Sequence, residues 1–164
     1  MYKRQFQSSA RRGQAHALAH LGRAGEALSV AQGALALART KGDTLAQIAA
    51  LQVLADIHAR PGSADDPALA PPPGMSAPSA PLHYLLLALD IATTIDGYTV
   101  PGALLDATAR EYAAVGDFER AYAIALRAGA ARDFTHSREA TNRAIAMQVQ
   151  YQTCLLYTSP SPRD

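Results

Sequence analysis

The stretches LGRAGEAL at 21–28 and VGDFERAY at 115–122 decide how this chain is expected to fold. Each has a glycine at its second position, Gly22 or Gly116, and an alanine five residues after that glycine. Glycine is the residue that most often ends a helix, and alanine is a good helix former with a small side chain. Each stretch therefore predicts a tight turn between two closely packed antiparallel helices.

The similarity between the two regions extends to both sides of the turns. Alanine recurs seven residues before each turn glycine and twelve residues after it, and a larger residue stands four before it. Small residues allow the two helices of a pair to approach, and larger ones fill the space between pairs. The matching positions are Ala15, Leu18, Ala27 and Ala34 in the first region, and Ala109, Tyr112, Ala121 and Ala128 in the second.

This pattern resembles the tetratricopeptide repeat, a helix–turn–helix unit of about 34 residues. The resemblance implies an all-α fold in which antiparallel helix pairs stack into a superhelix. The chain departs from the family pattern because it contains no tryptophan and because proline does not close each unit. The alternative interpretation is a generic alanine-rich helical bundle.

Apolar residues recur at spacings of three and four over most of the chain, and no segment alternates as a strand would. Gly42 is expected to end one helix and Asp43 to cap the next. A loop rich in Pro, Ala, Ser and Gly is expected at 62–80, inserted in the turn of a middle repeat. The predicted helices are Glu26–Ala38, Thr44 to about Ala59, Pro81 or Leu82 to Ile95, the vicinity of Pro101 to Ala114, Phe118–Ala131 and about Ser137 to Thr153.

The two ends of the chain, MYKRQ at 1–5 and CLLYTSPSPRD at 154–164, do not continue the alanine-rich pattern. Both resemble translated sequencing adapter and are excluded from the prediction of the fold. We therefore expect a natural segment cut from a longer protein; the alternative is a genuine Ser/Pro-rich tail. The expected organisation is helical repeats over 6–134, with the insertion at 62–80, and a truncated exit helix over 135–153.

Composition excludes several classes of function. The formal net charge is +1, and the adapter-like ends contribute Lys3, Arg4, Arg163 and Asp164, so the interior is close to neutral. Its charge therefore does not favour nucleic acid or an anionic membrane, and we expect neither as a partner. The single cysteine, Cys154, lies in the adapter-like tail, which leaves the interior without disulfides or thiolate metal sites and compatible with the cytoplasm. No apolar run approaches the ~18 residues that span a bilayer.

The sequence offers little that points to catalysis. His16 and His20 in HALAH have metal-ligand spacing, but Ala17 stands where a zinc protease carries its glutamate, and no third ligand is suggested nearby. No glycine-rich phosphate loop or activated serine is present. We expect no catalytic residue, cofactor or metal, although an enzyme that uses His16 and His20 is the third alternative for the function.

Tetratricopeptide arrays bind partners with first-helix residues on their concave side. Positions counted from the turn glycines predict a polar groove of mixed charge that would bind a peptide or a partner helix. The alternative is an ordinary solvated helix face. The predicted groove residues are Arg12, His16 and His20 in the first unit, Gln52, Asp56 and Arg60 in the second, and Asp106 and Arg110 in the third.

The C-terminal part suggests a biological context. Ala140, Ala144, Met147 and Tyr151 step by four, three and four, which is the start of a heptad seam, or equally of a packed cap. The sequence from about residue 46 to 153 also resembles multidomain bacterial signalling proteins in which such repeats precede a connecting helix and an output domain. The resemblance rests on this last helix, on the Pro-rich loop followed by APLHY, and on the IDGY turn.

The resemblance to signalling proteins implies an output domain beyond residue 153, first a diguanylate cyclase (GGDEF) domain and second a histidine kinase. None of the catalytic residues of either domain is in this chain. The expected function is therefore a non-catalytic protein-interaction and regulatory region, which binds a protein or peptide partner or self-associates through its exit helix. A stand-alone tetratricopeptide scaffold is the alternative.

Overall fold

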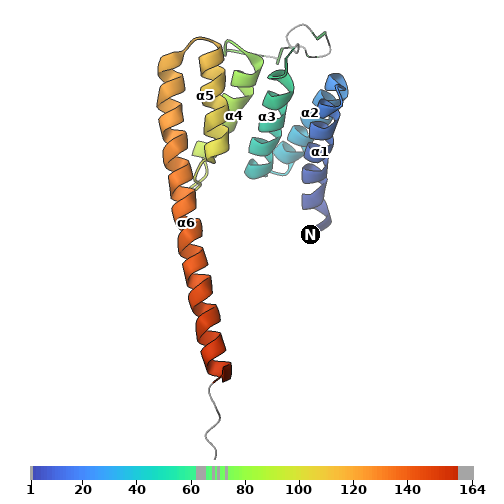
Figure 1. Ribbon diagram of the computed structural model, residues 1–164. Helices are drawn as coiled ribbons and strands as arrows, with labels where there is room; N and C mark the ends of the chain where they lie inside the picture. Colours follow the sequence, from blue (N-terminus) through green and yellow to red (C-terminus); the bar gives the residue numbers. More distant parts are fainter. Residues whose placement is uncertain (1, 62–65, 68, 70, 73, 159–164) are drawn as a thin grey trace, which may run out of the picture.

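The computed structural model describes residues 2–61, 66, 67, 69, 71, 72 and 74–158 (Figure 1). Within these residues the chain is all-α, as predicted, and forms no strand. None of the helices in the described part is long and apolar enough to cross a membrane. Six helices are described: α1 Tyr2–His20, α2 Ala24–Thr40, α3 Thr44–His58, α4 Ala80–Thr93, α5 Gly102–Ala114 and α6 Phe118–Thr158.

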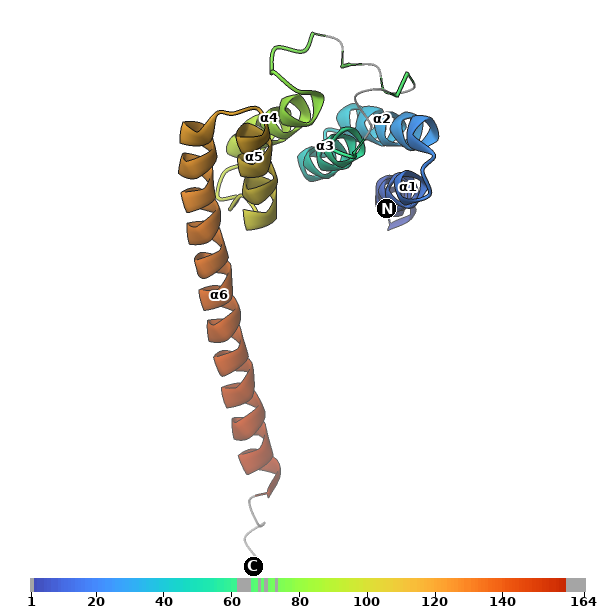
Figure 2. The ribbon, with the colours of Figure 1, turned by 45° about the horizontal axis from the view of Figure 1, so that its top comes forward.

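The helices pack mostly as sequential antiparallel neighbours. The most extensive contacts join α3 to α4, α5 to α6 and α1 to α2, followed by α2 to α3, and smaller ones join α1 to α3 and α4 to α5. Figures 1 and 2 show three pairs side by side in chain order, with α1 and α2 at one end and α5 and α6 at the other. Consequently α1, α3 and α5, the first helices of the pairs, follow one another along the molecule.

Three turns between helices share one hydrogen-bonding pattern. In each, a glycine at positive φ donates its N–H to the carbonyl three residues earlier, and the next residue donates to the carbonyl five residues earlier. This is the Schellman arrangement, which satisfies the last carbonyls of a helix and favours glycine because of the left-handed backbone. The glycines are Gly22, Gly42 and Gly116, at φ +76°, +64° and +84°. Asp43 then caps α3 through its carboxylate, which accepts from the Ala46 N–H at 2.9 Å, as predicted.

Small residues lie where the helices approach most closely. The alanines that match between the two regions of the sequence are all buried, and most of them are completely enclosed. They are Ala15, Ala27 and Ala34 at the α1–α2 pair, and Ala109, Ala121 and Ala128 at the α5–α6 pair. Leu51, Leu54 and Ile57 of α3 supply the bulk at the centre of the molecule, each at most 1% exposed.

At Gly102 the backbones of α5 and α6 approach closely. A Cβ atom built there would lie 2.9 Å from Cγ of Arg132 and 3.3 Å from the backbone oxygen of Ala128. Arg132 also forms an ion pair with Asp106, one turn further along α5. The small side chains at 102 and 128 therefore let the start of α5 rest directly on α6.

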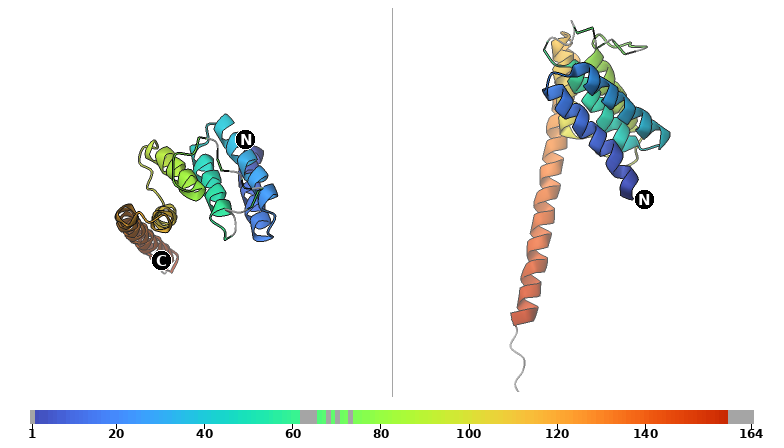
Figure 3. Two further views of the ribbon diagram at one scale, coloured as in Figure 1. Left: turned by 90° about the horizontal axis from the view of Figure 1, so that it is seen from above. Right: turned by 90° about the vertical axis from the view of Figure 1, so that its right-hand side faces the viewer.

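The predicted boundary between two C-terminal helices is wrong, because α6 is one continuous helix of 41 residues. No proline or glycine occurs between 130 and 158 to interrupt it, and Thr135 bonds to the Ala131 carbonyl within the helix. The helix also passes the expected end at Thr153. Beyond the bundle α6 extends as a single rod (Figure 3), and each residue from 132 to 154 is exposed.

The predicted loop at 62–80 is largely confirmed in its described residues, since α4 begins at Ala80 with Ser79 as its N-cap. Residues 62–65, 68, 70 and 73, including the expected turn glycine Gly62, lie outside the described part. Leu69 is 7% exposed and belongs to the main core, and Pro72 is also buried. Leu69 of this loop therefore contributes apolar contacts to the main core.

Candidate ligand-binding groove

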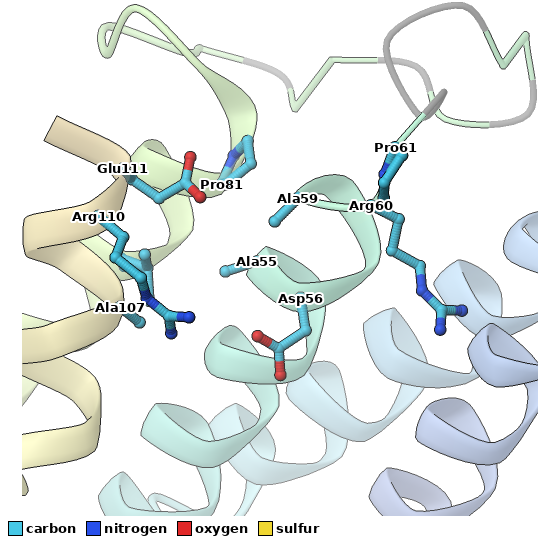
Figure 4. A pocket seen from close by; sticks show the side chains of 10 residues that line it. Ala55, Asp56, Ala59, Arg60, Pro61, Pro81, Ala107, Arg110 and Glu111 are labelled. Atoms are coloured by element: carbon cyan, nitrogen blue, oxygen red, sulfur yellow. The ribbon is translucent and has the colours of Figure 1, made fainter. Parts of the chain in front are cut away.

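Two adjoining pockets follow the first helices of the pairs. One, of about 310 Å³, lies between α3 and α5 and is shown in Figure 4; the start of α4 forms part of its wall. The other, of about 210 Å³, lies between α1 and α3. Asp56 and Arg60 line both pockets, so the two pockets adjoin, and we call them together the α1–α3–α5 groove.

The helical repeat explains why these side chains meet. Residues four apart lie on one face of a helix, so His16 and His20 project together from α1. Asp56 projects from the last turn of α3, and Arg60 follows just after that helix ends. The two histidine rings pack edge to face with their centroids 4.5 Å apart. The buried face of α3 carries Leu51, Leu54 and Ile57, which fixes the rotation of the helix and leaves the polar stripe facing the groove.

One hydrogen bond connects the segment just after α3 to α1. The Nη2 atom of Arg60 lies 3.1 Å from Nδ1 of His20. A guanidinium group only donates, so Arg60 is the donor of this contact. In Figure 4 the side chain of Arg60 points away from the α5 side of the groove and toward α1.

Asp56 is the acidic centre of the groove. Partial burial raises the pKa of its carboxyl above the ordinary value, and this effect outweighs the opposing influence of His16, Arg110 and Arg60. Figure 4 shows the side chains of Asp56 and Arg110 directed toward each other from α3 and α5. The carboxylate therefore lies near the cationic side chains of Arg60 and Arg110 and is exposed to solvent.

The sequence analysis missed Glu111, which lines the α3–α5 pocket beside Arg110. Burial raises the pKa of its carboxyl, and Arg110 partly counteracts that rise. The predicted stripe took every fourth residue, whereas positions 107, 110 and 111 of α5 face the pocket. A wider stripe of i, i+3 and i+4 positions is the signal that would have included Glu111.

The structure brings five of the eight predicted groove residues together: His16, His20, Asp56, Arg60 and Arg110. The other three do not line either pocket. Arg12 and Gln52 are half-buried, each one turn before a groove residue, and Asp106 faces α6, where it pairs with Arg132. Within the described residues no three His, Cys, Asp or Glu side chains are grouped so that they could hold a metal ion.

Comparisons with known proteins identify no relative. No family model, no curated protein and no solved structure matches the chain. The argument for function therefore depends on the groove and on the helix that leaves the bundle.

Proposed function

We propose that this chain is a non-catalytic interaction region of tetratricopeptide type that binds a peptide or a partner helix in the α1–α3–α5 groove. The observation that carries this proposal is the convergence of five predicted groove residues on two adjoining pockets. Extended grooves built from successive helices are typical binding surfaces of stacked helix pairs.

The buried alanines support a repeat relationship between the first and third pairs. The alanines that match in sequence around Gly22 and Gly116 are buried in both pairs, whereas the hydrogen bonds at these turns also occur at Gly42 and are general to helix ends. The two regions are 94 residues apart, so the shared geometry comes from matching residues in separate parts of the chain.

A peptide selection tests the proposed binding function. Twelve-residue peptides displayed on phage would be selected against the immobilised chain, and the affinity of selected peptides would be measured by fluorescence anisotropy. The double variant Arg60→Glu, Arg110→Glu should lose this binding, because it reverses two positive charges that line the groove. The matched control is Arg39→Glu, Lys41→Glu at the exposed end of α2, which should bind as the wild type does.

Two outcomes would count against the groove. Failure to enrich any peptide above selection on an unrelated helical protein would contradict a peptide-binding function. Equal loss of binding in the groove variant and the α2 variant would show that overall charge, and not the groove, determines the affinity.

We propose a second role for α6 as a connector that self-associates and relays a signal to an output domain, first a diguanylate cyclase and second a histidine kinase. The observation that favours it is the exposed rod from 132 to 154, on which Met147 and Tyr151 are 71% and 66% exposed. Small and apolar residues at heptad spacing form the contact surface along which two helices associate in a coiled coil. A stand-alone scaffold is the alternative.

Sedimentation equilibrium tests the self-association. The wild-type chain should form a concentration-dependent dimer, and Met147→Glu should shift it toward the monomer, whereas Gln148→Glu should leave it unchanged. A chain that is monomeric at all concentrations would contradict the relay through paired helices. The link to an output domain is tested by reading the source DNA past codon 153, where a cyclase or kinase sequence is expected.

A further inference from the structure

We propose that α6 pairs with the α6 helix of a second copy in the antiparallel direction, so that the exposed rod of each copy packs along the bundle part of the other. The bundle part of α6 is the segment 118–131 beside α5, and the rod is the segment 132–154. The inference rests on the proposed self-association of α6, to which it adds the contact surface and the direction of pairing.

The bundle part of α6 carries an apolar cluster on its outer side. Phe118, Tyr122 and Leu126 are 71%, 68% and 58% exposed. They recur every four residues and therefore follow one side of the helix. The side chains that α6 buries against α5, Ala121 and Ala128, lie on a different side. In Figures 1 and 2 the side of α6 away from α5 faces no other described helix, so the cluster is accessible to a partner.

The same side of the helix continues as an apolar surface along the rod. At 3.6 residues per turn, the heptad-spaced residues of the rod fall in the sector of about 80° that holds the cluster. Among them Met147 and Tyr151 are 71% and 66% exposed, whereas Ile145 and Val149 lie outside this sector. The surface is roughly 50 Å long. We call it the α6 stripe, and its residues are Phe118, Tyr122, Leu126, Ala140, Ala144, Met147 and Tyr151.

The order of side-chain sizes along the α6 stripe suits a second copy of the same helix. Bulky residues stand at both ends, and the small residues Ala140 and Ala144 stand between them. Antiparallel pairing places the segment 118–126 of each copy against the segment 147–151 of the other. Both copies then contribute the same surface, as a closed dimer with two-fold symmetry requires.

Asp133 favours the antiparallel direction. This exposed residue lies in the sector of the α6 stripe, between the bundle cluster and the apolar part of the rod. Parallel pairing would bring the two Asp133 carboxylates opposite each other, and like charges that meet in an interface are unfavourable. Antiparallel pairing centred near Ser137 places each Asp133 beside Ala140 and Ala144 of the second copy, and so separates the two carboxylates.

The exposed area of the α6 stripe is of the size that a stable dimer needs. An aromatic side chain has a surface of roughly 150–250 Å². Phe118, Tyr122 and Tyr151 are each about two-thirds exposed, so their burial in both copies would remove roughly 600–1,000 Å² from solvent. Leu126, Met147 and the alanines add to this area. Stable interfaces bury about 1,200–2,000 Å² in total, which the stripe can supply.

Disulfide trapping in the full chain tests the direction of pairing. Leu126→Cys and Met147→Cys would be made separately in a chain whose exposed Cys154 is replaced by serine, and one of them would carry a tag that changes its mass. The mixed variants would be equilibrated in a glutathione redox buffer and separated on a non-reducing gel. Antiparallel pairing predicts that disulfides between the two variants dominate over disulfides within either one.

A matched pair of substitutions tests whether the bundle part of α6 belongs to the interface. Leu126→Gln should raise the dimer dissociation constant at least about tenfold in sedimentation equilibrium, because each copy loses a large apolar side chain from the contact. Arg127→Gln is the control, since this exposed neighbour lies outside the sector of the α6 stripe, and it should leave the dissociation constant unchanged.

The outcomes distinguish this inference from the proposed self-association. Disulfides within each variant and none between them would show parallel pairing, which overturns the inference while α6 still self-associates. Equal dissociation constants for Leu126→Gln and wild type would exclude the bundle part of α6 from the interface and also overturn it. A wild-type chain that stays monomeric would instead overturn the proposed self-association, and the inference with it.

Discussion

Replacement of Ala128 by leucine tests the close packing of α5 on α6. Ala128 is fully buried, and its backbone oxygen would lie 3.3 Å from a Cβ atom at Gly102. Leucine adds three carbon atoms at a position where the neighbouring helix leaves little room. The added apolar surface cannot be accommodated without displacing α5, so the substitution should destabilise the fold.

The expected cost follows from the general behaviour of overpacked cores, about 1–3 kcal/mol. For a chain of this length each kcal/mol corresponds to a shift of roughly 2–4 °C in the midpoint of thermal unfolding, so Ala128→Leu should lower the midpoint by roughly 2–12 °C. Alanine and leucine are both good helix formers, so the change in helix propensity is a minor contribution.

Ala125→Leu is the matched control, because it makes the same substitution on the same helix at an exposed position. It should change the free energy of unfolding by no more than about 0.5 kcal/mol. Thermal and urea unfolding followed by circular dichroism at 222 nm would measure both variants. Equal stability of Ala128→Leu and wild type, or an equal loss in both variants, would refute the account of the α5–α6 contact.

Three further predictions concern the core, a helix cap and the groove. Leu51→Ala should lower the unfolding free energy by about 2–5 kcal/mol, because Leu51 is fully buried. Leu45→Ala, at an exposed position of α3, should cost little more than the change in helix propensity. A larger loss for Leu45→Ala than for Leu51→Ala in urea unfolding would contradict the assigned core. Asp43→Ala should cost about 1 kcal/mol through loss of the cap on α3 and Asp43→Asn much less, so equal losses in urea unfolding would argue against the cap. Because burial raises the pKa of Asp56, its carboxyl supports the fold when protonated, and that support is lost as the pH rises through the folded-state pKa. Asp56→Asn should therefore be more stable than wild type at about pH 7 and equal to it near pH 3; a variant less stable at pH 7 would show that the surrounding cations outweigh the burial.

Local residue chemistry made several parts of the fold predictable. Gly42 and Asp43 indicate the turn between α2 and α3. Gly42 favours a left-handed backbone, and Asp43 caps the next helix. The alanines that recur around Gly22 and Gly116 indicated which helices pack together, and those positions are buried. These features depend on residues close together in the chain.

The features that were missed depend on tertiary context or on weak local signals. The polar residues around 131–137 led to the prediction that one helix ends there and another begins. The segment contains no proline or glycine, however, and α6 continues through it. Asp106 was predicted to line the groove and Glu111 was not, but the rotation of α5 against α6 turns Asp106 toward Arg132 and Glu111 toward the groove. Helix rotation is set by packing partners, which a single helical pattern does not specify.

The most direct test of the proposed groove is a nuclear magnetic resonance titration of the isotope-labelled chain with a phage-selected peptide. The account predicts that the largest shift changes fall on the side chains that line the groove, His16, His20, Asp56, Arg60 and Arg110. Changes confined to α2 and the outer face of α4, or to the exposed rod of α6, would contradict it.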